Sequence, residues 1–287
     1  MKYGLPFFGL GPRHYARVAK AAEDHGFESV WMPEHLVLPA EMPPTYPYTE
    51  TGFPPITPDT PLFDPWVVLG GVATATERIR MATNVYILPL RHPIATARSV
   101  VTLDRLSGGR VTLGAGVGWL EQEFDQVGQD FANRGRRMDE IMGIVRRLWT
   151  EDVIEHHGEF YDIGPVKFAP KTLQDPNIPI EIGGSSKAAL RRAGRLGDGW
   201  VEIGSNDLDD LAAKMAVIEN HRKEAGRDHL AFEYTVGVGT DPDVIRRARD
   251  LGVTRILVGV TPTGERITAD TFVDFVGRFA DDVIAVV

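Results

Sequence analysis

A histidine that follows an apolar run is the residue of this chain whose type and position best suit catalysis. His35 closes such a run and is preceded directly by Glu34. Imidazole titrates near neutral pH, so His35 can serve as a general acid or base. An isolated histidine is more often a plain hydrogen-bonding residue, but at the carboxyl end of a strand a functional role is as frequent as a structural one. We therefore take His35 and its neighbour Glu34 as the candidate catalytic residues.

Two glycine-rich turns could bring backbone close to a ligand. Gly183, Gly184, Ser185 and Ser186 lie between a predicted strand and a predicted helix. Their N–H groups could bind a phosphate at the positive end of the helix, with a serine hydroxyl as a further donor. The alternative is an ordinary turn with a serine N-cap. Residues 114–118 match GxGxG but lack the rest of the dinucleotide fingerprint, so they are a weak nucleotide-binding signal.

Other sources of reactivity find little support in the sequence. The 287 residues include no cysteine, which excludes disulfides, thiolate nucleophiles and Cys-ligated metals. Zinc-protease, two-His-one-carboxylate and Gly-X-Ser-X-Gly patterns are also missing, which argues against a metal site and a serine hydrolase. A cluster of arginines lies at the start of a predicted helix and forms either a solvated helix face or a patch for an acidic cofactor tail; its members are Arg134, Arg136 and Arg137. An organic cofactor is therefore the predicted source of reactivity.

Composition narrows the classes of partner. The chain is 43% hydrophobic and 25% charged, as in an ordinary globular protein, and its formal net charge is −9. An acidic balance argues against a general affinity for nucleic acid, which needs a basic surface. Neither a signal-peptide pattern nor a run of about 18 apolar residues occurs. We expect a cytoplasmic protein with no membrane anchor that acts on a small-molecule substrate.

The elements that must position these residues alternate along the chain. Short β-branched runs are followed by longer amphipathic segments, a pattern that predicts βα units around a parallel sheet. Strands are predicted over residues 2–8, 28–32, 79–88, 110–115, 178–182, 199–203, 231–238 and 255–260. Helices are predicted over residues 12–25, 64–76, 93–106, 120–126, 136–148, 187–196, 208–225, 243–251 and 269–279. Eight strand–helix pairs favour an α/β fold of the (β/α)₈ TIM-barrel type over an open doubly wound sheet.

Two long segments interrupt this alternation within the single predicted domain of residues 1–287. The Pro-rich loop of residues 33–63 follows the second strand, so in a barrel it lies at the carboxyl rim where active sites form. It is either a lid over the active site or a mobile solvent loop. Residues 151–176, before the fifth strand, are predicted to be an insertion with short β-like pieces at residues 159–163 and 166–168.

Several of these segments together resemble the luciferase-like monooxygenase superfamily. They are GFESVWMPEH at residues 26–35, LPLRHP at 88–93, TLDRLSGGR at 102–110, GAGVGW at 114–119 and IGGS at 182–185. The superfamily includes bacterial luciferases and many oxidoreductases that use the deazaflavin coenzyme F420. Because the segments occur in the right order along one predicted barrel, the set is more specific than any one of them.

The resemblance implies a flavin-shaped cofactor across the carboxyl end of the barrel. Its phosphate is expected on the turn from Gly183 to Ser186. Its ring is expected against the end of the third strand, where Asn84 and Val85 match a bulge with a non-prolyl cis peptide. Gly116 and Val117 are expected to line the same site.

The resemblance also bears on the candidate catalytic residues. His35 matches a histidine near the reactive face of the ring, and Glu34 stands where many relatives have aspartate. Val117 stands where some F420-dependent dehydrogenases have a glutamate. We therefore do not transfer the sugar-phosphate dehydrogenase mechanism to this chain.

The sequence and the resemblance together allow three functions. The preferred one is an F420-dependent oxidoreductase that transfers a hydride to or from a small organic substrate. The second is a monooxygenase that uses reduced FMN and O₂, and the third is a non-catalytic relative that binds a cofactor. Because barrels of this family are often dimers, the resemblance also implies a homodimer.

Overall fold

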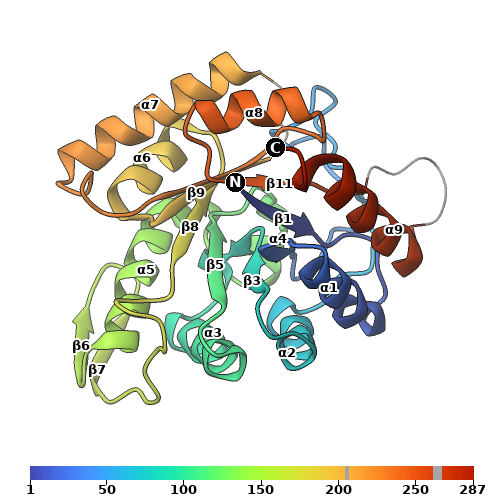
Figure 1. Cartoon of the computed structure of the whole chain (residues 1–287). Coiled ribbons are helices and arrows are strands. Elements are labelled where there is room, and N and C mark those ends of the chain that lie inside the picture. The colour runs from blue at the N-terminus through green and yellow to red at the C-terminus, as the bar shows by residue number, and fades with distance from the viewer. Residues whose placement is uncertain (204–206, 261–266) are drawn as a thin grey trace.

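The computed structural model, which describes residues 1–203, 207–260 and 267–287, contains a closed barrel of parallel strands (Figure 1). Its strands are β1 (Lys2–Pro6), β2 (Ser29–Met32), β3 (Arg80–Thr83), β4 (Tyr86–Ile87), β5 (Val111–Gly116), β8 (Ile180–Gly183), β9 (Gly199–Ile203), β10 (Glu233–Gly237) and β11 (Arg255–Leu257). β1 pairs with both β2 and β11, and β3 pairs with β5, which closes the ring. β3 and β4 together occupy one of the eight strand positions around the barrel. The predicted eight-stranded barrel is therefore confirmed.

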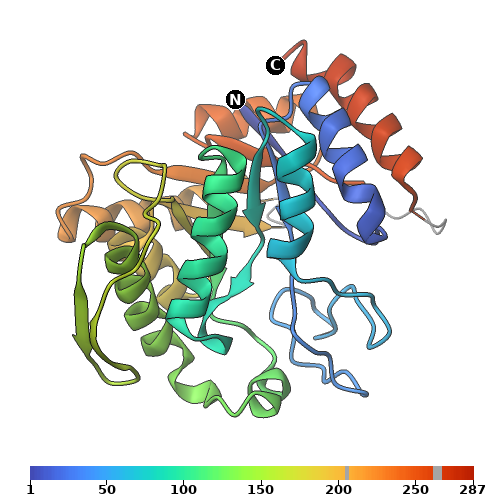
Figure 2. The same cartoon turned by 90° about the horizontal axis from the view of Figure 1, so that it is seen from below.

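Helices surround this barrel, with their apolar faces packed on the strands (Figures 1 and 2). They are α1 (Tyr15–Asp24), α2 (Pro65–Ala75), α3 (Pro93–Ser107), α4 (Glu121–Gln126), α5 (Arg134–Thr150), α6 (Lys187–Leu196), α7 (Leu208–Glu224), α8 (Pro242–Asp250) and α9 (Ala269–Phe279). Local sequence explains where several of them begin. At the start of α2 the Asp64 side chain accepts a hydrogen bond from Val67 N at 3.0 Å, and Pro65 occupies the first helical position.

The third barrel strand differs from the continuous strand predicted over residues 79–88. It is divided into β3 and β4 at the bond between Asn84 and Val85, which is cis, as the resemblance implied. β3 pairs with β2 and β5, whereas β4 pairs with the end of β5 alone. The break therefore changes the course of the backbone where the strand reaches the carboxyl end of the barrel.

Residues 151–176 contain an antiparallel hairpin of β6 (Ile154–His157) and β7 (Asp162–Val166) beside α5. The β-like pieces predicted at residues 159–163 and 166–168 are thus displaced. Gly158 N donates to Tyr161 O at 3.0 Å, so residues 158–161 form the turn. Glu140 on α5 accepts the N–H groups of Phe160 and Tyr161, each at 3.0 Å, which holds this turn on the helix. The sequence prediction did not anticipate this tertiary contact.

A buried ion-pair network fills the barrel near the amino ends of the strands. Arg255 Nη1 lies 2.8 Å from Glu181 Oε1, and Arg255 Nε lies 2.9 Å from Glu28 Oε2. Thr235 Oγ1 donates to Glu181 Oε2 at 2.8 Å. The side chains of Arg255 and Glu181 are 3% and 1% exposed. The buried charges of this network are therefore paired with one another, as a low-dielectric interior requires.

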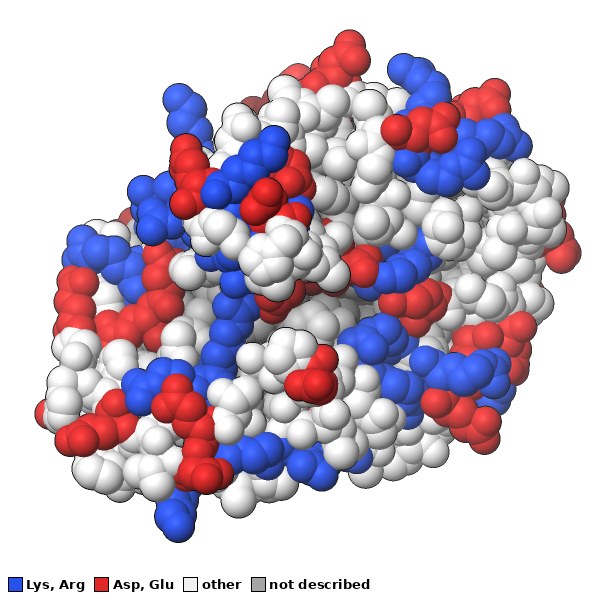
Figure 3. Space-filling model, turned by 60° about the vertical axis from the view of Figure 1, so that its left-hand side comes forward, with Lys and Arg blue, Asp and Glu red and all other residues white. Residues whose placement is uncertain are grey.

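Charges on the surface are mixed in sign on the face drawn in Figure 3, where Lys and Arg alternate with Asp and Glu. None of the helices in the described ranges is long and apolar enough to cross a membrane. The two chain ends lie near each other, and the blue loop of residues 33–63 lies at the opposite end of the barrel (Figure 2).

Candidate active site

A cavity of about 910 Å³ opens at the carboxyl ends of the barrel strands. This volume is within the usual range of small-molecule sites. The turns after β1, β2, β5 and β8 form its walls together with the loop of residues 33–63. All the residues proposed from the sequence line it, namely Glu34, His35, Asn84, Val85, Gly116, Val117, Gly183, Gly184, Ser185 and Ser186. The fold thus brings together residues that are up to about 150 positions apart.

His35 is oriented by a carboxylate that the sequence prediction missed. His35 Nδ1 lies 2.9 Å from Glu123 Oε2, and Glu123 Oε1 accepts from Leu36 N at 2.5 Å. The Glu123 side chain is fully buried, whereas that of His35 is 13% exposed. Since a carboxylate accepts hydrogen bonds, Nδ1 donates and Nε2 is the nitrogen left to exchange a proton. His35 Nε2 has no hydrogen-bond partner in the described chain.

Glu123 sits on α4, which packs Phe124 into a small apolar cluster. A buried glutamate beside an aromatic residue is unusual and is a signal of function or of structural pairing. No spacing rule connects it to His35, because the two residues are 88 positions apart. Only the tertiary fold identifies this pair.

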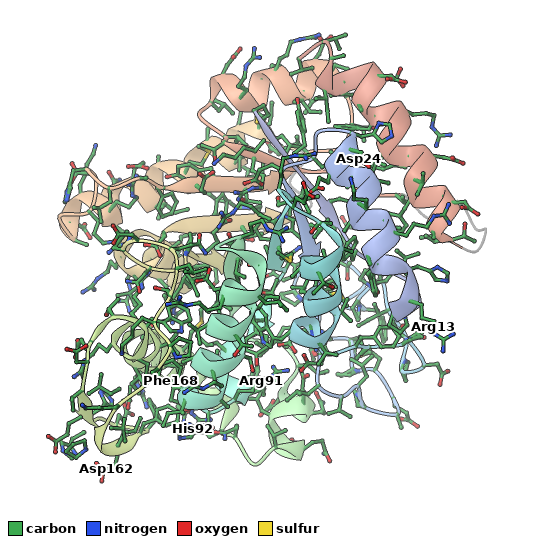
Figure 4. The ribbon with its side chains drawn as sticks, turned by 60° about the horizontal axis from the view of Figure 1, so that its bottom comes forward. Arg13, Asp24, Arg91, His92, Asp162 and Phe168 are labelled. Carbon is green, nitrogen blue, oxygen red and sulfur yellow. The ribbon has the colours of Figure 1, made fainter. Side chains whose placement is uncertain are left out.

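Glu34 lines the cavity but its carboxylate is committed elsewhere. Glu34 Oε1 lies 2.6 Å from Arg91 Nη1, and Oε2 pairs with Arg91 Nη2. Oε1 also accepts from Ile87 N at 2.6 Å. Arg91 lies just before α3, next to His92 (Figure 4). The carboxylate of Glu34 therefore holds the end of β4 in place. Its contacts are those of a structural residue and not of the catalytic residue expected from the sequence.

Val85 packs tightly between two strands of the site. A Cβ atom added to Gly116 would lie 2.4 Å from Val85 Cγ2, and one added to Gly183 would lie 2.5 Å from Val85 Cγ1. Real Cβ atoms do not approach other atoms this closely, so both positions require glycine while Val85 keeps this place. The bulge at Asn84 and Val85 thus explains the glycines at the ends of β5 and β8.

The turn after β8 has features of an ordinary turn with a serine N-cap and also features of a phosphate-binding turn. Ser186 is the N-cap of α6, accepting from Ala189 N at 3.2 Å, as in an ordinary turn. Ser185 Oγ donates to Glu202 Oε2 at 2.8 Å, so its hydroxyl is also engaged. Gly184 has a φ of +107°, which favours glycine. In the described chain the backbone N–H groups of Ser185 and Ser186 make no hydrogen bond, which leaves two donors for an anion.

Aromatic rings connect the loop of residues 33–63 to the rim of the barrel. The ring centroids of Tyr46 and Trp119 are 5.0 Å apart, and those of Trp119 and His35 are 5.8 Å apart. Trp119 thus lies at the cavity. The Tyr48 hydroxyl lies 3.2 Å from the position of a Cβ on Gly184. The loop therefore reaches from the turn after β5 to the turn after β8.

The charged and polar groups around the cavity indicate which kind of ligand it can bind. In the ranges that the structure describes, no group of three or more His, Asp or Glu side chains could hold a metal ion. Glu202 is paired with Lys214 at 2.9 Å, so its charge is compensated. The arrangement offers one oriented imidazole, free N–H groups at a glycine turn and apolar walls. It suits an organic cofactor with an anionic end and a planar ring.

Comparison with known proteins identifies the family. The family model described as luciferase-like monooxygenase matches residues 9–251. The chain is 36% identical over 276 residues to an uncharacterized protein of Mycobacterium tuberculosis, covering 94% of each. It is 32% identical to the F420-dependent glucose-6-phosphate dehydrogenase of Nakamurella multipartita, covering 84% of this chain and 68% of that one. The chain belongs to the luciferase-like monooxygenase family.

Two further comparisons complete this picture. The chain is 31% identical to the FMNH₂-dependent dimethylsulfone monooxygenase of Pseudomonas putida over 60% of this chain and 46% of that one. The crystal structure of the monooxygenase RslO1 from Streptomyces bottropensis superposes with a TM-score of 0.78 at 22% identity, covering 99% of both chains. The family is thus one of oxidoreductases, and the relatives named for a cofactor include one for F420 and one for reduced FMN.

Proposed function

We propose that this protein is an F420-dependent oxidoreductase acting on a small organic substrate. The observation that carries the proposal is the His35–Glu123 pair in a cavity able to hold a ring and a phosphate. The F420-dependent relative matches over 84% of the chain, whereas the FMNH₂-dependent relative matches over 60%. This difference favours F420, and FMN with O₂ is the second candidate.

The bound deazaflavin would supply the hydride chemistry at C5 of its ring, and the chain's own residues would position the reactants. Val85 and the glycines beside it would support the ring, and the turn from Gly183 to Ser186 would bind the phosphate. His35 Nε2 would hold or accept the proton that accompanies hydride transfer. Val117, at the place of a glutamate in some F420-dependent dehydrogenases, cannot exchange a proton, which leaves this task to His35.

The loop of residues 33–63 is proposed to act as the lid. The loop begins after β2, and its Tyr46 and Tyr48 contact the turns after the adjacent strands β5 and β8, so the loop can exclude water from the reacting atoms. Water exclusion strengthens the electrostatic contacts inside the site.

A titration of the purified protein with F420 and with FMN tests the proposal. Fluorescence quenching is expected to show saturable binding of F420 that is tighter than that of FMN. Tight binding of FMN without binding of F420 would replace the proposal by the monooxygenase alternative. If neither binds at high micromolar concentration, the non-catalytic alternative gains support.

We further propose that the protein is a homodimer. α2 carries no charged side chain, and on its outer side Val67 is 76% exposed. Leu106 on α3, which lies beside Gly70, is 52% exposed and extends this apolar surface. Such an exposed apolar patch is typical of an interface. Sedimentation velocity is expected to give a dimer that Val67→Lys converts to a monomer; a wild-type monomer would contradict the proposal.

A further inference from the structure

The loop of residues 33–63 turns an apolar face toward the cavity. Its aromatic and aliphatic residues that line the cavity are Tyr46, Tyr48, Ile56, Leu62 and Phe63. None of the charged residues between positions 36 and 63, a segment that the structure describes in full, lines it. A charged group placed against this wall would lose water and find no partner there, whereas an apolar group gains free energy from burial. The wall therefore favours apolar over charged ligands.

The backbone of the same wall is poor in hydrogen-bond donors. Pro47, Pro54, Pro55 and Pro61 line the cavity, and proline has no N–H group. Proteins bind anions through N–H groups and cationic side chains. This side of the cavity thus differs from the turn after β8, whose free N–H groups suit an anion.

The charged side chains of the loop are all carboxylates. Residues 33–63 include Glu34, Glu41, Glu50 and Asp59 but neither Lys nor Arg. Glu34 is paired with an arginine. The other three are exposed, and they form no ion pair in the part of the chain that the structure describes. An anion that approaches the loop is therefore repelled, most strongly at low salt.

The arginine cluster at the start of α5 supplies little compensation. Arg136 is exposed and Arg137 is buried, whereas Arg134 is the one Lys or Arg among the described residues that line the cavity. Arg134 lies away from the loop, where its Nε donates to Gly118 O at 3.2 Å and its Nη1 to Phe131 O at 2.8 Å. Under the proposed function the cofactor brings its own anionic end into the cavity. One cation cannot balance this end and an anionic substrate as well.

Apolar side chains also surround the mouth of the cavity. Phe8 and Tyr48, which line it, are 38% and 52% exposed. Leu36 and Phe53 of the loop, each next in sequence to a lining residue, are 44% and 47% exposed. Exposed apolar side chains that gather in this way are typical of a ligand-binding groove.

We propose that the substrate is an uncharged molecule with an apolar body, and that the loop of residues 33–63 selects it by excluding anions. The inference rests on the proposed function, because it concerns the molecule that shares the cavity with the cofactor. At about 910 Å³ the cavity is in the upper part of the usual range of roughly 300–1,000 Å³, which leaves room for both. Phosphorylated, sulfonated and carboxylated substrates are the classes that this wall rejects.

Two probes with the same aromatic body test the inference by binding alone. N-phenylnaphthylamine is uncharged, and anilinonaphthalenesulfonate differs from it by one sulfonate. Equilibrium dialysis against protein saturated with F420 is expected to show the uncharged probe bound at least about tenfold more tightly at low salt, the effect of one unpaired charge. Equal affinities, tighter binding of the sulfonate, or loss of the uncharged probe when F420 is added would overturn the inference.

Lysine variants place the selection on the loop. Ile56→Lys and Leu62→Lys each put a cation into the wall, so each should narrow the ratio of the two affinities by about tenfold or more. Added salt should raise the affinity of the wild type for the sulfonate and lower that of the lysine variants. Ile56→Met controls for the loss of isoleucine, and Val153→Lys adds the same charge at an exposed position outside the cavity. Both should keep the wild-type ratio.

The failure of this inference can be told apart from failure of the proposed function. An unchanged ratio in both lysine variants would overturn the inference while F420 binding, measured first and without a probe, still supports the proposed function. If F420 does not bind, the proposed function fails. The same two probes and variants then test the charge selection on the protein without cofactor, where the same ratios are expected.

Discussion

Replacing His35 by alanine is expected to slow turnover with F420 by about 10²- to 10⁴-fold, the usual contribution of a positioned general acid or base. The cofactor affinity of the variant should stay within severalfold of wild type, because the phosphate and ring contacts come from other residues. His35 Nδ1 is engaged with Glu123, so the expected loss is that of proton exchange at Nε2. Pre-steady-state hydride transfer, followed by the absorbance of the deazaflavin, measures it.

Glu123→Gln tests the orienting carboxylate separately. The amide can still contact the imidazole but cannot compensate its positive charge, so we expect a loss of about 10- to 100-fold in turnover. The affinity of the variant for F420 should stay within severalfold of wild type, as in His35→Ala, because neither change removes a contact to the phosphate. His157→Ala, on the exposed hairpin, is the matched control and should behave as wild type. Unchanged turnover in His35→Ala would remove the residue from its role.

Arg255→Met is expected to destabilise the barrel by about 3–5 kcal/mol, the cost of leaving a buried charge without its partner. Arg255 contacts both Glu181 and Glu28, and burial of the Glu181 carboxyl raises its pKa even with this arginine present. Unfolding in urea, followed by circular dichroism, measures the free energy of unfolding. Arg246→Met is the control, because its ion pair with Asp243 is exposed and contributes little.

The pH dependence of this variant has a definite sign. A carboxyl whose pKa is raised in the folded state favours folding when protonated, and this contribution is lost as pH rises through the folded pKa. Without Arg255 the pKa of Glu181 rises further, so the destabilisation should be greatest at neutral pH and smaller in acid. Adding Glu181→Gln to Arg255→Met should recover part of the loss. A loss below about 1 kcal/mol at neutral pH would show that the network contributes little.

The fold was predictable because its signals are local and repeated. Alternating strands and helices, with caps such as Asp64 and Pro65, predict a barrel, and a barrel places the ends of strands together. The placement of His35 at the cavity followed from this rule alone. The division of the third strand at Asn84 was implied by the resemblance, since hydrophobic periodicity runs through residues 79–88 without a break.

The contacts within the site could not be predicted, because they join residues without a shared pattern. Glu123 pairs with His35 across 88 positions, and Ser185 turns its hydroxyl to Glu202 rather than into the cavity. Glu34 and His35 are neighbours in the sequence just after β2, yet their side chains have different partners. The carboxylate of Glu34 binds Arg91, a residue that the sequence shows only as the neighbour of His92.

The close packing of Val85 between Gly116 and Gly183 has a consequence for how such sites diverge. An alanine at either glycine position collides with the valine, so single substitutions there are disfavoured whatever cofactor the barrel binds. Val85→Gly would remove the obstacle and make alanine tolerable at positions 116 and 183. We expect Gly116→Ala to be strongly non-additive with Val85→Gly in a double-mutant cycle. The three positions are thus energetically coupled, because an alanine at position 116 or 183 is tolerated only when the side chain at position 85 is smaller than valine.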